Sequence, residues 1–536
     1  MWVGSIEEIC SGSMTDLPGG RLMSATLDFI KGDFWSTLFP LRTTLIVAEH
    51  FEQGLSKHIY EKVLSASPTD NFLPQQRVFA TKPRGHLRRT VKLDPVAEYY
   101  IYDLAVRNKS IFRKQVSGAR SSFGYRFENS APYPINLAFR KFRETLIEKN
   151  SAFKHSIRFD IASYFNSIYH HDLTAWFSSK GVSSEDGRGF GQYCREINAG
   201  RSVDFLPQGI YPTKMIGNEF LKFFELSGQI KCAQSVRFMD DIYLFDDSEI
   251  VIARDFEKIQ QLLGAFGLNV NPSKTAYDEA ISDVSNAVTQ IKKDLLQIVE
   301  VEQFVDTASG VEVVSESVEV EAALNSAQVE ALLAFLRSDL LEEGDADLIL
   351  NILRSHSDSV LEFFPILLRK FPNIYKHLYT VALQTSDRGE LASILVEFLK
   401  EGYALLEYQL FWLAVIAEEA LSATSQFGDI LVLIYELTAE CPIARARVLE
   451  IPIQNFGFKE IRSDFLKTGA SNWSAWASAV GSRSLHDAER NYTLDYFSKA
   501  SPLNFLVASA VKGWVEPERP KGMRALFERF RGRISA

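Results

Sequence analysis

The sequence feature that most restricts how this chain can fold is a pair of adjacent acids inside an apolar stretch. Asp240 and Asp241 stand at the centre of residues 235–245, with Val, Phe, Ile, Tyr and Leu on both sides. Such flanks are typical of two short strands, which predicts that the acids lie at the tip of a β-hairpin. Neighbouring carboxylates repel each other, so holding both between buried strands is costly unless a cation lies beside them. Mg²⁺, a hard cation that prefers oxygen ligands, meets that requirement.

A third acid ends an apolar run earlier in the chain. Asp160 follows residues 156–159, Ser-Ile-Arg-Phe, and the pattern after it predicts a helix. Three acids can hold the two metal ions, ~3.5–4 Å apart, that clamp the attacking and leaving oxygens of a nucleotidyl transfer. An Asp-Asp turn alone is also common at solvated surfaces. The prediction of a metal-dependent site therefore depends on the three acids together.

Four stretches in the order of one enzyme family make the chain resemble a reverse transcriptase. Asp160, with an aromatic residue five positions later, is similar to the first palm motif, and residues 238–241 are similar to the Phe/Tyr-x-Asp-Asp motif. Leu206–Gly209 followed by Thr213 resembles Leu-Pro-Gln-Gly…Ser, with Thr in place of the usual Ser. Residues 267–275 resemble the motif that comes next in the family.

The resemblance implies a DNA polymerase that uses dNTPs and two Mg²⁺ ions. Asp160 and Asp240 would ligate both ions, with Asp241 adjacent and the carbonyl of Ile161 completing the ligand set. Phe165 would lie under the sugar, where its ring excludes a 2′-hydroxyl. The other interpretation of Phe165 is a core aromatic on a helix.

Nucleotide-binding residues follow from the same resemblance. Gln208 and Gly209 would shape the pocket for the base and the sugar, and Lys274 would help to neutralise or protonate the leaving group. These expectations come from the family and not from the spacing of the residues.

Residues 79–91 predict a strand, a Gly-containing turn and a second strand, with basic residues on both sides of the turn. The segment resembles the fingers hairpin of reverse transcriptases, which grips the incoming triphosphate. Lys82 and either Arg88 or Arg89 would be the gripping groups. Arginine can bind phosphate oxygens bidentately, whereas lysine acts as a point charge.

Charge is distributed unevenly along the chain. The net charge of −10 divides into +2 for residues 1–280 (34 basic, 32 acidic) and −12 for the remainder (24 basic, 36 acidic). Residues 77–158 alone hold 18 basic and 6 acidic residues, just ahead of the first candidate catalytic acid. Such a concentration suits nucleotide and polynucleotide phosphates. A solvated basic face is the alternative.

The four cysteines have no paired spacing, which argues against a disulfide framework and against a zinc site and fits a reducing cytosol. The chain opens with no basic-then-apolar leader and contains no run of 18 apolar residues. We therefore expect a cytoplasmic protein without a membrane partner.

The expected fold class is α+β, with reverse-transcriptase fingers and palm followed by an all-α, HEAT-like helical domain. Apolar residues recur at helical spacing after residue 326, in pairs of helices roughly 35–40 residues apart, which is typical of an α-solenoid. The expected domains are 1–76 (the N-terminal helical part of the fingers), 77–280 (fingers and palm), 281–325 (a linker or excursion) and 326–536 (helical). Within the linker, residues 311–314 are the only strand-like run expected.

This domain order narrows the resemblance to the bacterial abortive-infection (Abi) reverse transcriptases, a phage-defence group. Ser121–Arg126 also resembles a Ser-x-Gly-Phe/Tyr-Arg motif of group II intron and retron-like enzymes. The Abi resemblance implies a homo-oligomer that makes single-stranded DNA without a template, primed by and attached to the protein itself. The sequence does not choose a priming residue among its 19 tyrosines. Two alternatives remain: a template-dependent, retron-like enzyme that copies a specific RNA, and a non-catalytic helical scaffold with a decayed palm.

Overall fold

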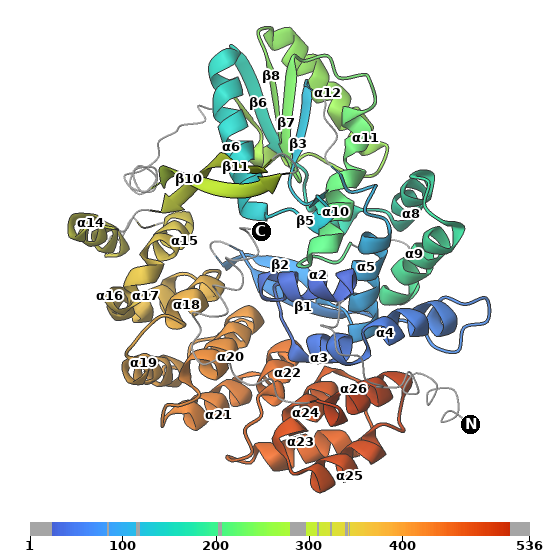
Figure 1. Cartoon of the computed structure of the whole chain (residues 1–536), viewed down its shortest axis with the longest axis vertical. Coiled ribbons are helices and arrows are strands. Elements are labelled where there is room, and N and C mark those ends of the chain that lie inside the picture. Colours follow the sequence, from blue (N-terminus) through green and yellow to red (C-terminus); the bar gives the residue numbers. More distant parts are fainter. Residues whose placement is uncertain are drawn as a thin grey trace.

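The computed structural model describes residues 24–514, apart from 83–84, 114–117, 202–205, 279–295, 308–309, 322–323, 338–340 and 342. Parts of the expected N-terminal segment, linker and C-terminal domain therefore lie outside the described residues. The chain is a mixed α+β protein. Figure 1 shows a five-stranded sheet at one end of an elongated molecule and an array of helices at the other, with the N-terminal helices between them.

The five-stranded sheet has the order β3-β7-β8-β6-β9. β3 runs parallel to β7, and the other neighbours are antiparallel. The strands are β3 (Arg120–Phe123), β6 (His155–Asp160), β7 (Gln234–Phe238), β8 (Asp241–Asp246) and β9 (Ala276–Tyr277). The hairpin predicted around the paired acids is confirmed, because β7 and β8 are antiparallel neighbours joined at Met239 and Asp240.

Helices cover both faces of this sheet. α6 (Ile135–Ala152) packs Phe142 and Leu146 against one face, where they join a buried cluster with Tyr243 and Phe245 of β8. α12 (Glu249–Gly264) packs on the other face, where the rings of Phe256 and Phe159 lie 5.0 Å apart. Successive strand residues point to opposite faces, so β8 supplies apolar side chains to both layers.

The first half of the chain holds further helices and short strands besides the sheet and its two covering helices. α5 (Pro95–Arg107) begins after Asp94, whose carboxylate accepts hydrogen bonds from the N–H groups of Val96 and Ala97 at 2.9 and 3.0 Å. The other elements of this region are α2 (Ala25–Asp33), η1 (Phe34–Ser36), α3 (Arg42–Phe51), α4 (Gln53–His58), the π-helical η2 (Ile59–Val63), β1 (Gln76–Thr81), β2 (Leu87–Lys92), β4 (Phe127–Glu128), β5 (Ala131–Pro132), α7 (Tyr164–Ser167), α8 (His170–Ser179), α9 (Ser184–Ile197), α10 (Tyr211–Phe220), α11 (Lys222–Glu225) and η4 (Pro272–Lys274).

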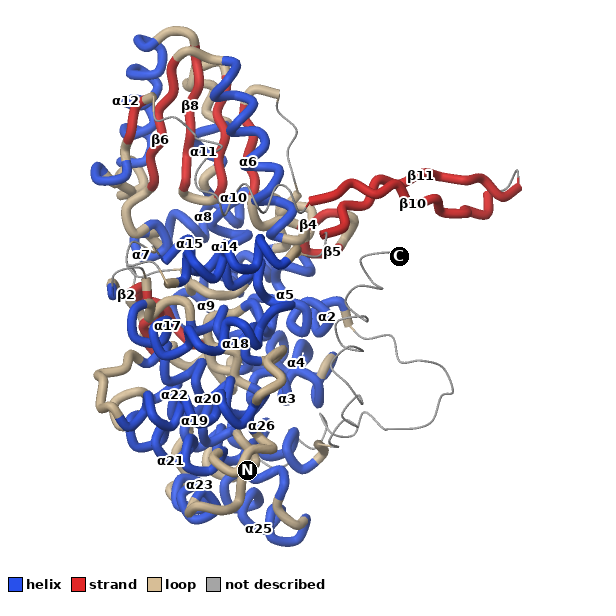
Figure 2. Tube along the Cα trace, turned by 90° about the vertical axis from the view of Figure 1, so that its left-hand side faces the viewer, coloured by secondary structure: helices blue, strands red, loops and turns tan. Residues whose placement is uncertain are grey.

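The expectation of a single strand-like run at residues 311–314 is wrong. β10 (Leu296–Thr307) and β11 (Gly310–Glu321) form an antiparallel hairpin in which Thr307 is opposite Gly310. Figure 2 shows this hairpin projecting from the body of the molecule. Both strands alternate Val or Ile with polar residues over much of their length, a period-two pattern that the acidic composition of the segment obscured.

The second half of the chain is helical, as its apolar spacing predicts. Its elements are α14 (Ser326–Leu336), α15 (Glu343–Ile352), η5 (Leu353–His356), α16 (Ser357–Val360), η6 (Leu361–Phe363), α17 (Phe364–Lys370), α18 (Tyr375–Ala382), α19 (Arg388–Lys400), α20 (Glu407–Leu421), α21 (Phe427–Leu437), α22 (Pro442–Glu450), α23 (Phe458–Lys467), α24 (Trp473–Gly481), η7 (Ser482–Ser484), α25 (Asp487–Phe497) and α26 (Pro502–Lys512). A HEAT-like repeat remains a prediction. Within the described ranges, no helix is long and apolar enough to cross a bilayer.

The helical half holds the segment 35–43 with aromatic contacts. The Trp35 ring stacks on Tyr379 with centroids 5.7 Å apart. The buried Phe39 ring meets Tyr408 and Phe411 of α20 edge-on, at 5.9 and 5.2 Å. We call residues 35–43 the junction segment, since it connects α2 to α3 while packing against helices more than 300 residues later in the chain.

Polar groups reinforce the same contact. Lys376 donates from Nζ to the carbonyls of residues 36 and 37, at 2.9 and 3.2 Å. The fully buried carboxylate of Glu450 accepts from the main-chain N–H groups of Arg42 and Thr43, at 2.8 and 2.7 Å. A buried carboxylate at a helix start satisfies N–H groups that have no partner within the helix. The junction segment is therefore held through both its side chains and its backbone.

Candidate active site

Strand register brings the three predicted acids together at one end of the interior strands β6 and β8. β6 ends at Asp160, β8 begins at Asp241, and these two residues are direct partners in the antiparallel pair. Asp240 stands at the turn just before β8. Directly opposite residues in such a pair have Cα atoms about 4.5–5.5 Å apart. The structure therefore gathers the carboxylates that the motifs predict.

Burial and mutual repulsion shape the electrostatics of this cluster. Burial raises the pKa of Asp240, and the charges of Asp160 and Asp241 raise it further. Burial also raises the pKa of Asp241, although the neighbouring Arg158 guanidinium opposes that shift. Crowded, desolvated carboxylates of this kind favour a nearby cation.

Two basic side chains stand against the acids. Lys274 places Nζ 2.5 Å from Oδ2 of Asp160, and Arg158 places Nε 3.3 Å from Oδ1 of Asp241. Lys274 was predicted to belong to the site. Arg158 was missed, although the sequence offers a signal: it precedes Asp160 by two residues in one strand, so both side chains lie on the same face.

The three acids offer the type of ligand atom that a magnesium ion binds. Carboxylate oxygens are the donors that Mg²⁺ prefers, and Oδ1 of Asp160 is buried with no hydrogen-bond partner. In the part of the chain that the structure describes, no group of three or more His, Cys, Asp and Glu stands ready to hold a metal ion. Metal binding would require Lys274 to leave Asp160. Its side chain is 60% exposed, so the ammonium group is hydrated when it moves away from Asp160.

The predicted basic hairpin lies within electrostatic reach of the acids. Partial burial lowers the pKa of Lys82, and repulsion from Arg88 and Lys274 lowers it further, while Asp160 and Asp240 act in the opposite direction. Lys82 follows the last residue of β1, and its N–H donates to the carbonyl of His86 across the turn. The strand–turn–strand prediction is thus confirmed.

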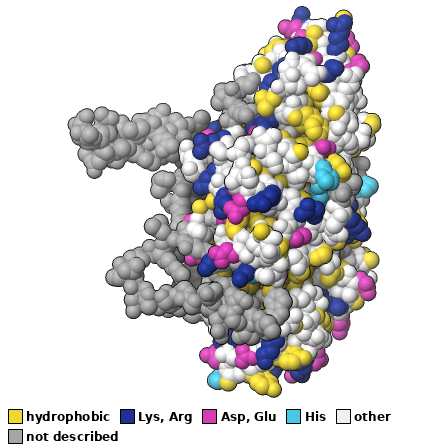
Figure 3. All heavy atoms as spheres, turned by 90° about the vertical axis from the view of Figure 1, so that its right-hand side faces the viewer, with side chains coloured by type: hydrophobic (Ala, Val, Ile, Leu, Met, Phe, Trp, Pro, Cys, Tyr) yellow, Lys and Arg dark blue, Asp and Glu magenta, His cyan; other side chains and the backbone are white. Residues whose placement is uncertain are grey.

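The arginines of the hairpin lie on β2, where Arg88 is exposed and Arg89 is half-buried. Their partners across the hairpin are Ala80 and Phe79. Pro83 and Arg84, which come between the two strands in the sequence, lie outside the described residues. Figure 3 shows that Lys and Arg are interspersed with Asp and Glu on one face of the molecule, without a single basic patch there.

The Gln208–Gly209 loop lies beside the junction segment. The Thr90 hydroxyl donates to the Gln208 carbonyl at 2.8 Å. Gly209 has φ +108°, and a Cβ added to it would lie 3.0 Å from Cδ1 of Leu38. Glycine is therefore required at this position both for its backbone conformation and for the close approach of Leu38.

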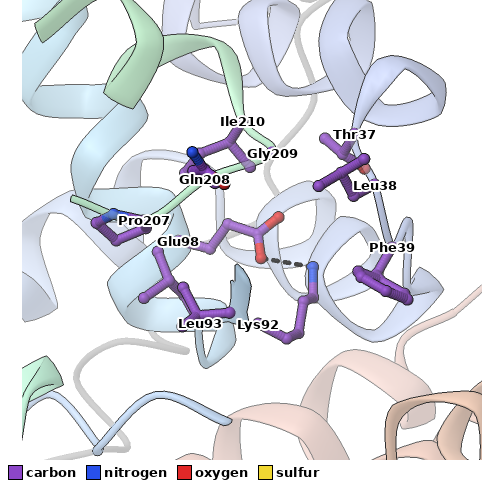
Figure 4. Close-up of a pocket in the computed structure, with 11 residues that line it drawn as sticks. Thr37, Leu38, Phe39, Lys92, Leu93, Glu98, Pro207, Gln208, Gly209 and Ile210 are labelled. Carbon is purple, nitrogen blue, oxygen red and sulfur yellow. Dashed lines mark hydrogen bonds and ion pairs between the residues drawn. The ribbon is translucent and has the colours of Figure 1, made fainter. Parts of the chain in front are cut away.

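Figure 4 shows the small pocket that this contact bounds. Gln208 and Gly209 line one side, Leu38 and neighbouring residues of the junction segment line another, and the Lys92–Glu98 ion pair, 2.6 Å long, lies between them. None of the three acids is among the described residues that line it. The pocket therefore lies between the loop and the junction segment, and not at the acid cluster.

Phe165 lies on α7 and is 7% exposed. A Cβ added to Gly217 of α10 would lie 3.3 Å from the Phe165 ring, so the two pack closely. This environment is compatible with both interpretations of Phe165, and the role in excluding ribose stays a prediction. Ile161 pairs with Val270 in a β-bridge, which joins the end of β6 to the motif at residues 267–275.

No protein-family model matches the chain, and no curated protein matches it. Among solved structures, apo telomerase from Candida tropicalis aligns over 73% of this chain and 70% of that chain, with 12% identity and a TM-score of 0.27. Telomerase from the same organism in complex with a fragment of telomeric RNA aligns over 72% of this chain and 67% of that chain, with 15% identity and a TM-score of 0.28. Telomerase is a reverse transcriptase, but similarity at these TM-scores carries no conclusion about activity or partners.

Proposed function

We propose that this chain is a DNA polymerase of the reverse-transcriptase family that uses dNTPs and Mg²⁺. The supporting observation is that Asp160, Asp240 and Asp241 converge at one end of β6 and β8. The charges of Lys82 and Lys274 interact with these acids. Acids that bind a divalent cation, next to basic groups that bind phosphates, are the combination that nucleotidyl transfer needs.

Asp160, Asp240, Asp241 and the Ile161 carbonyl are the groups that would hold the metal. When bound, Mg²⁺ supplies charge stabilisation at the attacking hydroxyl and at the pyrophosphate leaving group. The chain's own groups would orient the substrate around it.

Substrate binding would involve three regions of the chain. Lys82, with Arg88 or Arg89, would bind the triphosphate. Phe165 would exclude a 2′-hydroxyl, and the Gln208–Gly209 loop would bound the nucleotide pocket. Lys274, once released from Asp160, would donate a hydrogen bond or a proton to the leaving pyrophosphate.

We further propose untemplated, protein-primed synthesis of single-stranded DNA by a homo-oligomer acting in cytoplasmic antiphage defence. This finer proposal rests on the Abi resemblance and on the helical half that follows the candidate palm. A priming phenol must be accessible, which argues against the buried Tyr243. Exposed tyrosines of the described helical half are Tyr403, Tyr492 and Tyr496.

The test is incubation of the purified full-length protein with labelled dNTPs and Mg²⁺, with and without nucleic acid. We expect incorporation without added template, and a label that protease treatment releases from the protein. The double variant Asp240→Asn, Asp241→Asn should incorporate nothing while keeping the wild-type circular dichroism, because it retains the shape of both side chains. Undiminished incorporation by the double variant would contradict the assignment. A product that appears only with template and primer would favour the retron-like alternative.

One observation favours a second candidate, a non-catalytic scaffold. Asp160 and Asp241 are each engaged by a basic side chain of the chain itself, Lys274 and Arg158. A decayed palm could keep its acids neutralised in this way. Absence of incorporation under every condition, together with no Mn²⁺ binding, would favour that candidate.

A further inference from the structure

Arg237 lies in β7, three residues before Asp240, and its side chain is 0% exposed. A buried guanidinium is unfavourable unless its charge is balanced and its N–H groups are paired. Such a residue in the buried part of a strand calls for a specific partner. The motifs assign it no role.

Each of the five N–H groups of Arg237 has an acceptor. Nε and Nη2 donate to the two carboxylate oxygens of Glu225, at 2.7 and 3.2 Å. Nη1 and Nη2 donate to Oδ1 and to the main-chain carbonyl of Asn218, at 3.0 and 3.1 Å. Nη1 also donates to the main-chain carbonyl of Met239, at 2.9 Å. This arrangement uses the full donor capacity of the guanidinium.

The bond to Met239 reaches the turn that carries the acids. Met239 has φ +56°, a left-handed conformation that is uncommon for a residue with a side chain and persists where its surroundings hold it. Arg237 binds the carbonyl of this residue, which belongs to the peptide unit leading into Asp240. The direction of that peptide unit is thereby fixed.

Two further elements close around the same turn. Gly124, with φ +116°, comes so near that an added Cβ would lie 3.6 Å from Sδ of Met239 and 3.5 Å from Oδ1 of Asn218. Asn218 follows Gly217, which packs on the Phe165 ring. Helix α10 thus contacts Phe165 at one residue and holds Arg237 at the next.

We propose that Arg237 is a positioning residue, which holds Met239 in its left-handed conformation and so fixes Asp240 relative to Asp160. Glu225 balances its charge, and Asn218 ties it to α10, the helix that follows the Gln208–Gly209 loop. The inference rests on the proposed function in that it assigns metal binding to the acids. Its test therefore includes a metal-binding measurement that needs no turnover.

The test variant is Arg237→Lys, which keeps the positive charge facing Glu225. A lysine ammonium has three donors at one point and cannot reach acceptors on three residues in the geometry of a guanidinium. Mn²⁺ binding to the nucleotide-free, full-length protein is measured by electron paramagnetic resonance, and kcat and KM for dNTPs are measured separately. We expect the Kd for Mn²⁺ to rise at least about 10-fold and kcat to fall about 100-fold, with KM changed less than about threefold.

The matched control is Arg447→Lys, a second arginine that is 0% exposed and paired with a carboxylate, in the helical half. This control should lower the unfolding midpoint but leave the Kd for Mn²⁺ unchanged. A rescue variant adds Met239→Gly to Arg237→Lys. Glycine adopts a positive φ without steric penalty, so it should restore part of the lost Mn²⁺ affinity.

Wild-type Mn²⁺ affinity and kcat in folded Arg237→Lys would overturn the proposal, as would an equal loss of Mn²⁺ affinity in the Arg447→Lys control. Failure of Met239→Gly to restore any affinity would also refute it. Should Arg237→Lys not fold, Asn218→Ala removes one acceptor and leaves the charge pair intact. Unchanged Mn²⁺ affinity in that variant overturns the proposal.

If the wild-type protein binds Mn²⁺ but incorporates no nucleotide, the proposed function fails while the binding measurement still decides the role of Arg237.

Discussion

Gly209→Ala tests whether the junction segment presses directly on the predicted nucleotide loop. Gly209 has φ +108°, and holding a non-glycine residue in such a region costs about 1–3 kcal/mol. The added methyl would also lie 3.0–3.3 Å from Cδ1, Cγ and Cβ of Leu38. Overpacking of this kind costs a further 1–3 kcal/mol, approximately. We therefore expect a total loss of about 2–6 kcal/mol in the free energy of unfolding.

The two contributions can be separated. Gly402 has φ +75° and no atom within 4 Å of an added Cβ, so Gly402→Ala reports backbone strain alone. Leu38→Ala removes the contacted side chain, so Gly209→Ala should cost less in that background than in the wild-type protein. Urea denaturation measures the free energies, and KM for dNTPs reports the displaced loop. The reasoning is refuted if Gly209→Ala costs no more than Gly402→Ala, or if Leu38→Ala leaves its cost unchanged.

Two further predictions concern sugar choice and pH. Phe165→Val should increase ribonucleotide use relative to dNTP use by at least about 10-fold, because it removes the excluding ring; a wild-type enzyme that uses both sugars equally would rule out this role. Burial raises the pKa of Glu407 to about 7, against the opposing hydrogen bonds from the N–H groups of Ile443 and Ala444. A carboxyl with a raised folded-state pKa loses stabilisation as the pH rises from about 4.5 through about 7. Glu407→Gln should therefore unfold at a higher temperature than the wild-type protein at pH 8 and at the same temperature at pH 4, and equal midpoints at both pH values would contradict the shift.

The sequence predicts the local elements of the candidate site well. The hairpin around Asp240 and the basic hairpin at residues 79–91 depend on patterns within about ten residues, and the structure has both of them. The sequence predicts that Asp160, Asp240 and Asp241 share one site, but the direct pairing of Asp160 with Asp241 has no local signal. Their pairing depends on strand register over 81 positions, which local patterns do not encode.

Other features could not be predicted because they depend on tertiary placement. The Lys274–Asp160 ion pair joins residues 114 positions apart, and Arg237 binds Glu225 and Asn218, 12 and 19 positions earlier in the chain. Composition misled in one case, since the acidic stretch 296–321 forms two long strands and was expected to hold only a short one. Contacts of the junction segment with the helical half likewise have no local signal.

The way in which the helical half holds the junction segment restricts how the chain can be divided. A fragment that ends near residue 325 would expose the Phe39 ring, leave the N–H groups of Arg42 and Thr43 without the Glu450 carboxylate, and free Leu38 to move away from Gly209. Exposed aromatic surface and unsatisfied backbone donors favour aggregation over folding. The candidate catalytic part is therefore not a detachable module, and an insertion or exchange in the helical array that moves the junction segment would disturb the Gln208–Gly209 loop.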